Sequence, residues 1–120
     1  MSAQATDSSR QESSRIEGGL LIRSVTPARG REPYEHSCEQ AVYEEVAHTI
    51  TECAGEPFTM EDIRAATGHP WTQVAVAMAF LKERGCIVPS IKRKHVAASG
   101  DTHLDAMIEW HALRERPAER

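Results

Sequence analysis

The sequence predicts a small α+β domain, mainly helical, with a three-helix core, a two-stranded basic hairpin and a C-terminal helix. Three observations predict it. Residues 38–115 hold four segments with apolar side chains at helical spacing. Glycine and proline signals separate these segments. The stretch CIVPSIKRKHVAAS, residues 86–99, is β-branched on both sides of a basic centre. A chain of 120 residues has the length for one modest core.

The N-terminal residues 1–34 are expected to be an arm that is disordered or loosely ordered. They open with MSAQATDSSRQESSR, which is rich in serine and charge and offers almost nothing to bury. Within them, GGLLIRSVTP is a short apolar run that could add an edge strand to a sheet or remain loose. We therefore divide the chain into the arm, a folded domain over residues 35–116 and a tail over 117–120.

The first two helices are expected over residues 38–54 and 60–67. Ser37 stands three positions before Gln40, the spacing of a capping box, and Gly55 supplies a stop. The second helix has Thr59 as its cap, Asp62 at the third helical position, and Gly68 at its end. The apolar positions expected to pack inward are Val42, Val46, Ile50, Cys53, Phe58 and Ile63.

The third helix is expected to begin at Pro70, whose missing N–H is harmless in a first turn, and to end at Gly85. Its inner stripe would be Val74, Ala77, Met78 and Leu81. At about 100° per residue, the outer face would then hold Thr72, Val76 and Ala79, flanked by Gln73 and Phe80. Trp71 lies at the edge of the inner stripe, and packing is the expected role of its ring.

The hairpin over residues 86–99 would carry Lys92, Arg93 and Lys94 at its tip, with Pro89 confined to an edge. A fourth helix follows the capping candidates Asp101 and Thr102 and stops at Pro117. The residues expected on its inner stripe are Leu104, Met107, Ile108 and Ala112, while Trp110 and Leu113 lie off that stripe and are the expected contact of a homodimer.

A helix, a short helix, a glycine turn, a third helix and a basic hairpin make a helix-turn-helix followed by a wing. The run TMEDIRAATGHPWTQVAVAMAFLKERGCIVPSIKRKH resembles the winged helix-turn-helix superfamily, including regulators of the multiple-antibiotic-resistance and arsenic-repressor types. The resemblance is carried by Val74, Ala77, Met78 and Leu81 followed by KERGCIV, and extends over about residues 37 to 115. It implies that the third helix meets base edges and that the wing meets phosphate or the minor groove.

On this sequence, those roles fall to two groups of residues, and the expected partner is double-stranded DNA. Thr72 and Gln73 could bond to bases, and Val76 and Ala79 could touch thymine methyl groups. The outer face has no Arg or Lys before Lys82, so strong guanine recognition is not expected. The phosphate contacts would come from the wing residues Lys92, Arg93 and Lys94, with His95 beside them.

A second function class remains open, an interaction module that binds protein and never touches DNA. An outer patch of Val76, Ala79 and Phe80 would be apolar and exposed, as partner surfaces are. The first helix is acidic and could also dock a partner. The discriminating observation is whether random-sequence duplex is bound at low salt.

Composition and motifs weigh against other functions. The net charge of −4 excludes a uniformly basic coat, although eight acidic residues over 33–63 and five basic residues over 82–95 make the chain electrically two-sided. No nucleophile elbow, phosphate-binding glycine loop or paired-carboxylate motif is present, so no enzymatic activity is expected. His103 and His111 are about two helical turns apart, too far for one metal ion. We expect no metal, no cofactor, no membrane contact and a cytoplasmic location.

Overall fold

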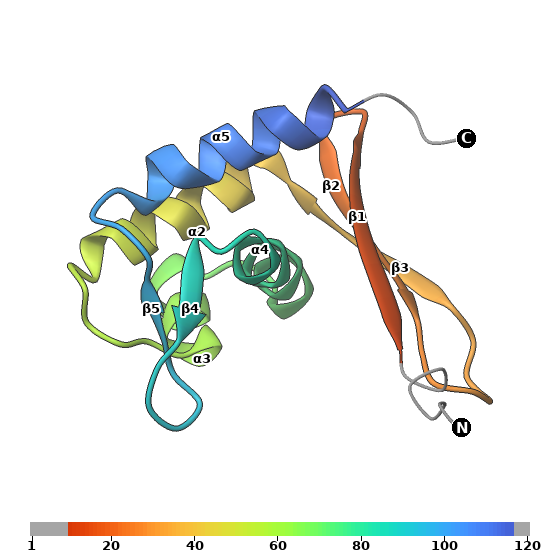
Figure 1. The fold of residues 1–120 in the computed structure, drawn as a ribbon, viewed down its shortest axis with the longest axis horizontal. Coiled ribbons are helices and arrows are strands. Elements are labelled where there is room, and N and C mark those ends of the chain that lie inside the picture. Colours follow the sequence, from red (N-terminus) through yellow and green to blue (C-terminus); the bar gives the residue numbers. More distant parts are fainter. Residues whose placement is uncertain (1–9, 117–120) are drawn as a thin grey trace.

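The computed structural model describes residues 10–116, which form an α+β arrangement of four helices and two small antiparallel sheets (Figure 1). The α+β class is confirmed, with more strand than the sequence predicted. The elements in chain order are β1 (Gln11–Glu17), β2 (Leu20–Thr26), β3 (Tyr34–Glu39), α2 (Gln40–Glu52), α3 (Met60–Thr67), α4 (Trp71–Glu83), β4 (Ile87–Pro89), β5 (His95–Ala97) and α5 (Thr102–Arg114).

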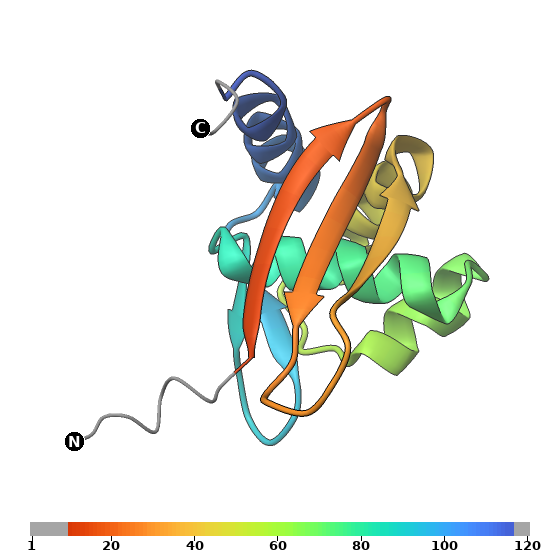
Figure 2. The same ribbon diagram turned by 90° about the vertical axis from the view of Figure 1, so that its right-hand side faces the viewer.

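Helix α4 occupies the centre of the arrangement and the other elements surround it on three sides. In Figure 1, α2 and α5 lie above α4, the sheet β1-β2-β3 lies on one side of it, and α3 with the β4–β5 hairpin lies on the other. Figure 2 shows that the sheet crosses α4 along much of its length. Helices α2 and α5 contact each other through Tyr43. Its ring centroid lies 5.0 Å from that of Trp110, and its hydroxyl donates to the carbonyl of Ala106 at 2.7 Å.

The expectation of a disordered or loose arm is wrong for the described part of residues 1–34, because strands β1 and β2 are formed there. Gly18 and Gly19 have φ of 58° and 78°, which the two-residue turn between these strands requires. Strand β2 is the central strand, paired to both β1 and β3. The side chains of Leu21 and Val25 lie on the same face of β2, toward α4, and both are buried. Cys38 is the buried residue of β3, and β1 has no fully buried residue, so the sheet packs on α4 mainly through β2 and Cys38. Residues 1–9 and 117–120 of the predicted arm and tail lie outside the described residues.

Helix α2 begins differently from the prediction. Ser37 belongs to strand β3, and the N-cap is Glu39, whose side chain makes no capping bond. The backbone N–H of Glu39 donates instead to Oε1 of Gln73 on α4, at 2.9 Å. The start of α2 is therefore fixed by a tertiary contact, which a local capping pattern cannot reveal. The inward stripe is confirmed for Val42, Val46 and Ile50, which are fully or nearly buried.

The two middle helices match the prediction closely. Thr59 Oγ1 accepts from the N–H of Asp62 at 3.0 Å, and the Asp62 carboxylate accepts from the N–H of Thr59 at 2.9 Å, so the capping box at α3 is confirmed. Gly68 ends α3 with a φ of 75°. Pro70 is the N-cap of α4 rather than its first residue, and Gly85 follows the helix with a φ of 79°.

Helix α5 presents a different face from the one predicted, although Met107 packs partly buried against the core as expected. Trp110 and Leu113 are buried, whereas Leu104 and Ile108 are each 54% exposed. The N-cap is Asp101, whose carboxylate accepts from the N–H of Leu104 at 3.0 Å. The cause of the reversal is the size of Trp110, which fills the space against Tyr43 on α2 and thereby sets the rotation of the helix. The predicted dimer contact through Trp110 and Leu113 is therefore wrong.

Candidate nucleic-acid interface

The connection between α3 and α4 is short and internally bonded. Only residues 68–70 separate the two helices. Gly68 N–H donates to the carbonyl of Arg64 at 2.8 Å, and Thr67 Oγ1 donates to the carbonyl of Ile63 at 2.9 Å. His69 Nε2 lies 2.7 Å from Glu45 Oε1 on α2, which ties the turn to the first helix of the core. These bonds close the C-terminal end of α3 and anchor the turn to α2.

Around its circumference, α4 has three different environments. The inner stripe of Val74, Ala77, Met78 and Leu81 is buried, as predicted. A second side is also buried and holds Val76, which is 4% exposed, and Phe80. The remaining side is open and carries Trp71, Thr72 and Lys82, with Ala75 and Ala79 half-exposed between them.

The buried second side corrects the predicted outer face. Phe80 packs against Tyr43, with ring centroids 6.0 Å apart, and Val76 faces the inner side of the N-terminal sheet. A hollow of about 140 Å³ between that sheet and α4 is lined partly by Val25, Tyr34 and Ala79. Val76 is therefore unavailable as a base contact, and Phe80 forms no exposed patch. Of the apolar patch predicted to need a partner, Val76 is covered by the sheet and Phe80 by α2 of the same chain, and Ala79 remains half-exposed.

Gln73 is likewise engaged within the molecule. It is half-exposed, and its side-chain oxygen accepts from the N–H of Glu39 at the start of α2. Thr72 is exposed, as a base-contacting residue needs to be. Trp71, which the sequence assigned to packing, is 47% exposed on the open side. The open stripe could have been found from the spacing of Trp71, Ala75 and Lys82, once the other side of the helix was taken to be covered.

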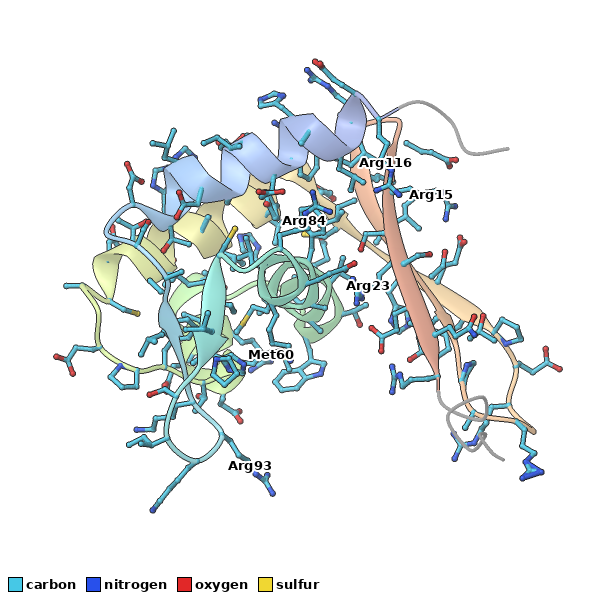
Figure 3. The ribbon with its side chains drawn as sticks, viewed as in Figure 1. Arg15, Arg23, Met60, Arg84, Arg93 and Arg116 are labelled. Atoms are coloured by element: carbon cyan, nitrogen blue, oxygen red, sulfur yellow. The ribbon has the colours of Figure 1, made fainter. Side chains whose placement is uncertain are left out.

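An arginine fastens the sheet to α4. Arg23 on β2 is only 11% exposed in its side chain and points toward α4 (Figure 3). Its Nε donates to Glu12 Oε1 at 2.9 Å, and its Nη1 donates to Ser14 Oγ and to Glu83 Oε1, both at 2.7 Å. Burial alone would raise the pKa of Glu12, but the bonds and charges of Arg23 and Arg10 outweigh burial and lower it. The guanidinium of Arg23 is already bonded to two carboxylates of the same chain, so it has few N–H groups left to bind an external anion.

The basic hairpin, residues 87–97, displays its cations through a tight turn. Lys94 N–H donates to the carbonyl of Ile91 at 2.9 Å, and Ser90 N–H donates to the carbonyl of Lys94 at 2.8 Å. Lys92 takes a φ of 55°, a positive value typical of tight hairpin turns and uncommon for a lysine. An isolated bridge between Phe58 and His95 fixes the hairpin to the segment before α3. Lys92, Arg93 and Lys94 are all exposed at the tip, and Figure 3 shows Arg93 pointing away from the body.

The cations of the hairpin continue onto α4. The positive charge of Lys82 is close enough to His95 to act on it, since burial and then the charge of Lys82 lower the pKa of that imidazole. Within residues 10–116, the side chains of Lys82, Lys92, Arg93 and Lys94 make no ion pair. We name these four residues the cationic row. Lys92, Arg93 and Lys94 were predicted site residues and are exposed together at the tip, whereas Lys82 was not assigned to the site from the sequence.

Two cysteines and a histidine with chemically reactive side chains are ordinary structural groups in this fold. Burial raises the pKa of Cys38 to about 12 and of Cys86 to about 11, as in inert buried thiols. His103 stacks on His48 with centroids 3.8 Å apart. No group of three or more potential metal ligands is found in the part of the chain that the structure describes.

Comparison of the chain with protein-family models, curated proteins and solved structures gives no match. None of the helices described is both long enough and apolar enough to cross a membrane.

Proposed function

We propose that this chain is a winged helix-turn-helix domain that binds double-stranded DNA, mainly through the phosphate backbone and with weak discrimination between sequences. The observation that carries the proposal is the cationic row. Four cations lie on the hairpin tip and the adjoining side of α4, exposed and without carboxylate partners among the described residues. A helix pair followed by a projecting hairpin is an arrangement that binds duplex DNA, and duplex DNA is a polyanion.

The weak sequence discrimination follows from the sheet. B-DNA has a major groove about 12 Å wide, which admits one helix about 10–12 Å across. The sheet β1-β2-β3 packs directly on one side of α4, and in Figures 1 and 2 both the sheet and the hairpin extend below this helix. A helix flanked in this way cannot enter the groove to full depth. Phosphate contacts therefore contribute most of the binding free energy.

The residues left to contact bases or sugars are few. Thr72 is exposed and can bond to a base edge, and the ring of Trp71 can stack or pack on a sugar. Val76 is buried and Gln73 is bonded to α2, so neither is part of the proposed interface. His95 pairs with Pro89 at the tip end of the ladder, next to the proposed phosphate contacts.

The test is the affinity for random-sequence duplex as a function of salt. If each member of the cationic row neutralises one phosphate, log affinity falls with log salt with a slope of about −4. The triple variant K92A/R93A/K94A should then show a slope of about −1 and bind on the order of 100-fold more weakly at about 50 mM salt, by similar factors for unrelated sequences. Fluorescence anisotropy with labelled duplexes measures both quantities.

A matched control loses the same charge elsewhere. Arg15, Arg114 and Arg116 are exposed or half-exposed, and Figure 3 places Arg15 and Arg116 at the end of α5 far from Arg93. R15A/R114A/R116A should keep the wild-type slope. Failure of the wild type to bind duplex at about 50 mM salt would overturn the proposal and favour the protein-binding alternative. Tighter binding of single strands than of duplex would also overturn it.

A further inference from the structure

Helix α5 carries an apolar stripe on the outside of the molecule. Leu104 and Ile108 are each 54% exposed and stand one helical turn apart. Asp101 before them and His111 after them lie on the same face and are exposed. The spacing of these four residues is three, four and three, which is the repeat of the seam between two paired helices. Figure 1 shows α5 along the upper border of the molecule with no other element above it.

We propose that this face pairs with the same face of a second copy of the chain, with the two α5 helices antiparallel. In that register, Leu104 of one copy meets Ile108 of the other, so the seam has two apolar layers at its centre. The next layer on each side joins Asp101 to His111 of the other copy. The Asp101 carboxylate caps α5 through one oxygen, and its second oxygen, which makes no hydrogen bond within residues 10–116, can accept from an imidazole N–H. A parallel pairing would instead put Asp101 against Asp101, and we reject it for that reason.

The surface beside the seam also fits a second copy of the chain. A hollow of about 230 Å³ beside Ile108 is lined by Arg84, Gly85, Cys86, Asp105 and Glu109, and gives room for a side chain from the other copy. The two Asp105 carboxylates would face each other across the axis. Arg84 stands on the same flank, where its Nε donates to Glu109 at 2.8 Å, and its remaining N–H groups can offset that repulsion.

The contact does not depend on DNA binding, and it leaves the DNA surface free. The tip of the basic hairpin lies at the opposite border of the molecule from α5 (Figure 1). A single pair of helices buries less than the roughly 1,200 Å² at which stable complexes begin, so we expect a weak dimer with a Kd on the order of 100 µM.

Sedimentation equilibrium from about 10 µM to about 1 mM tests the proposal, because the average mass should rise from that of one chain toward twice that value. I108K should remain a monomer throughout that range, since it places a charge in both apolar layers. Ile91 on the hairpin is 65% exposed, and I91K is the matched control, expected to associate like the wild type. A wild type that stays monomeric over the whole range would overturn the proposal, whatever its affinity for DNA.

The register has its own test. In a C53S background, a mixture of L104C and I108C proteins treated with a short bismaleimide should form the crosslinked heterodimer in preference to either homodimer. The other two cysteines, Cys38 and Cys86, are buried and should not react. Stronger crosslinking of each single variant with itself would indicate parallel helices and contradict the proposed pairing.

Discussion

The two β elements on either side of α4 carry similar numbers of cations but use them in opposite ways. On the strands of the N-terminal sheet, Arg15 and Arg23, with Arg10 just before β1, all bond to carboxylates of the same sheet or of α4. Arg29 and Arg31, in the loop between β2 and β3, are exposed and make no ion pair among residues 10–116. In the basic hairpin, the three tip cations have no such partner among the described residues. The strands of the sheet therefore use their charge to hold the molecule together, and the hairpin leaves its charge exposed, where the proposed DNA contact would lie. Counting basic residues along a sequence cannot separate these two uses.

The largest expected effect on stability comes from removing the ion pairs that Arg23 makes within the molecule. Replacing Arg23 by Ala removes bonds to Glu12, Ser14 and Glu83 and leaves two carboxylates facing each other at the joint between sheet and α4. We expect the free energy of unfolding to fall by about 2–3 kcal/mol. Urea denaturation monitored by circular dichroism measures this change.

Arg15 on the same sheet provides the control, because it faces the outer side and is 41% exposed in its side chain. Its pairs with Glu17 and Glu35 are screened by solvent, so R15A should change the free energy of unfolding by less than about 1 kcal/mol. Equal losses for R23A and R15A would contradict the view that Arg23 anchors the sheet to α4.

A smaller loss of stability is expected at Gln73, where a substitution can show whether this side chain supports the fold or contacts DNA. Replacing it by Ala leaves the N–H of Glu39 without its side-chain acceptor at the start of α2, which should lower the free energy of unfolding by about 1 kcal/mol. The affinity of the folded protein for DNA should not change. At the neighbouring exposed position, T72A should show the reverse pattern, with unchanged stability and a loss of affinity of a few-fold. A large loss of affinity in Q73A with unchanged stability would restore Gln73 as a base-contacting residue.

The sequence predicted the parts of the fold that depend on local patterns. The capping box of Thr59 and Asp62, the stop at Gly68 and the inner stripe of α4 all follow from residues within one or two helical turns, and the structure confirms them. The exposure of Lys92, Arg93 and Lys94 was also predictable, because a polar hairpin tip has nothing to bury it.

The errors arose where a distant segment decided the outcome. Val76 and Phe80 looked like an outer face because helical geometry gives the direction of a side chain and not what lies in that direction. The rotation of α5 was missed for a related reason: either of its two apolar stripes could face the core, and the fit of Trp110 against Tyr43 decides between them. The apolar run of β2 allowed an edge strand to be considered, but its pairing with two strands could not be inferred because the partners β1 and β3 are mostly polar.

The smallest expected effect lies at His95 on β5, which is bonded to Phe58 and lies within reach of the charge of Lys82 on α4. Burial and the charge of Lys82 lower the pKa of this imidazole in the free protein, so the folded chain holds fewer protons there than an unfolded one does near pH 6. A phosphate bound beside the hairpin would raise the pKa again, and a group whose pKa rises on binding takes up a proton. Affinity for DNA should therefore increase about 3-fold as the pH falls from about 7.5 to about 5.5 at constant ionic strength. H95Q should remove most of that increase, whereas H111Q, on α5 and away from the hairpin, should keep it. Parallel pH profiles for the wild type and H95Q would show that no phosphate lies near His95, and would confine the DNA contact to the tip of the hairpin.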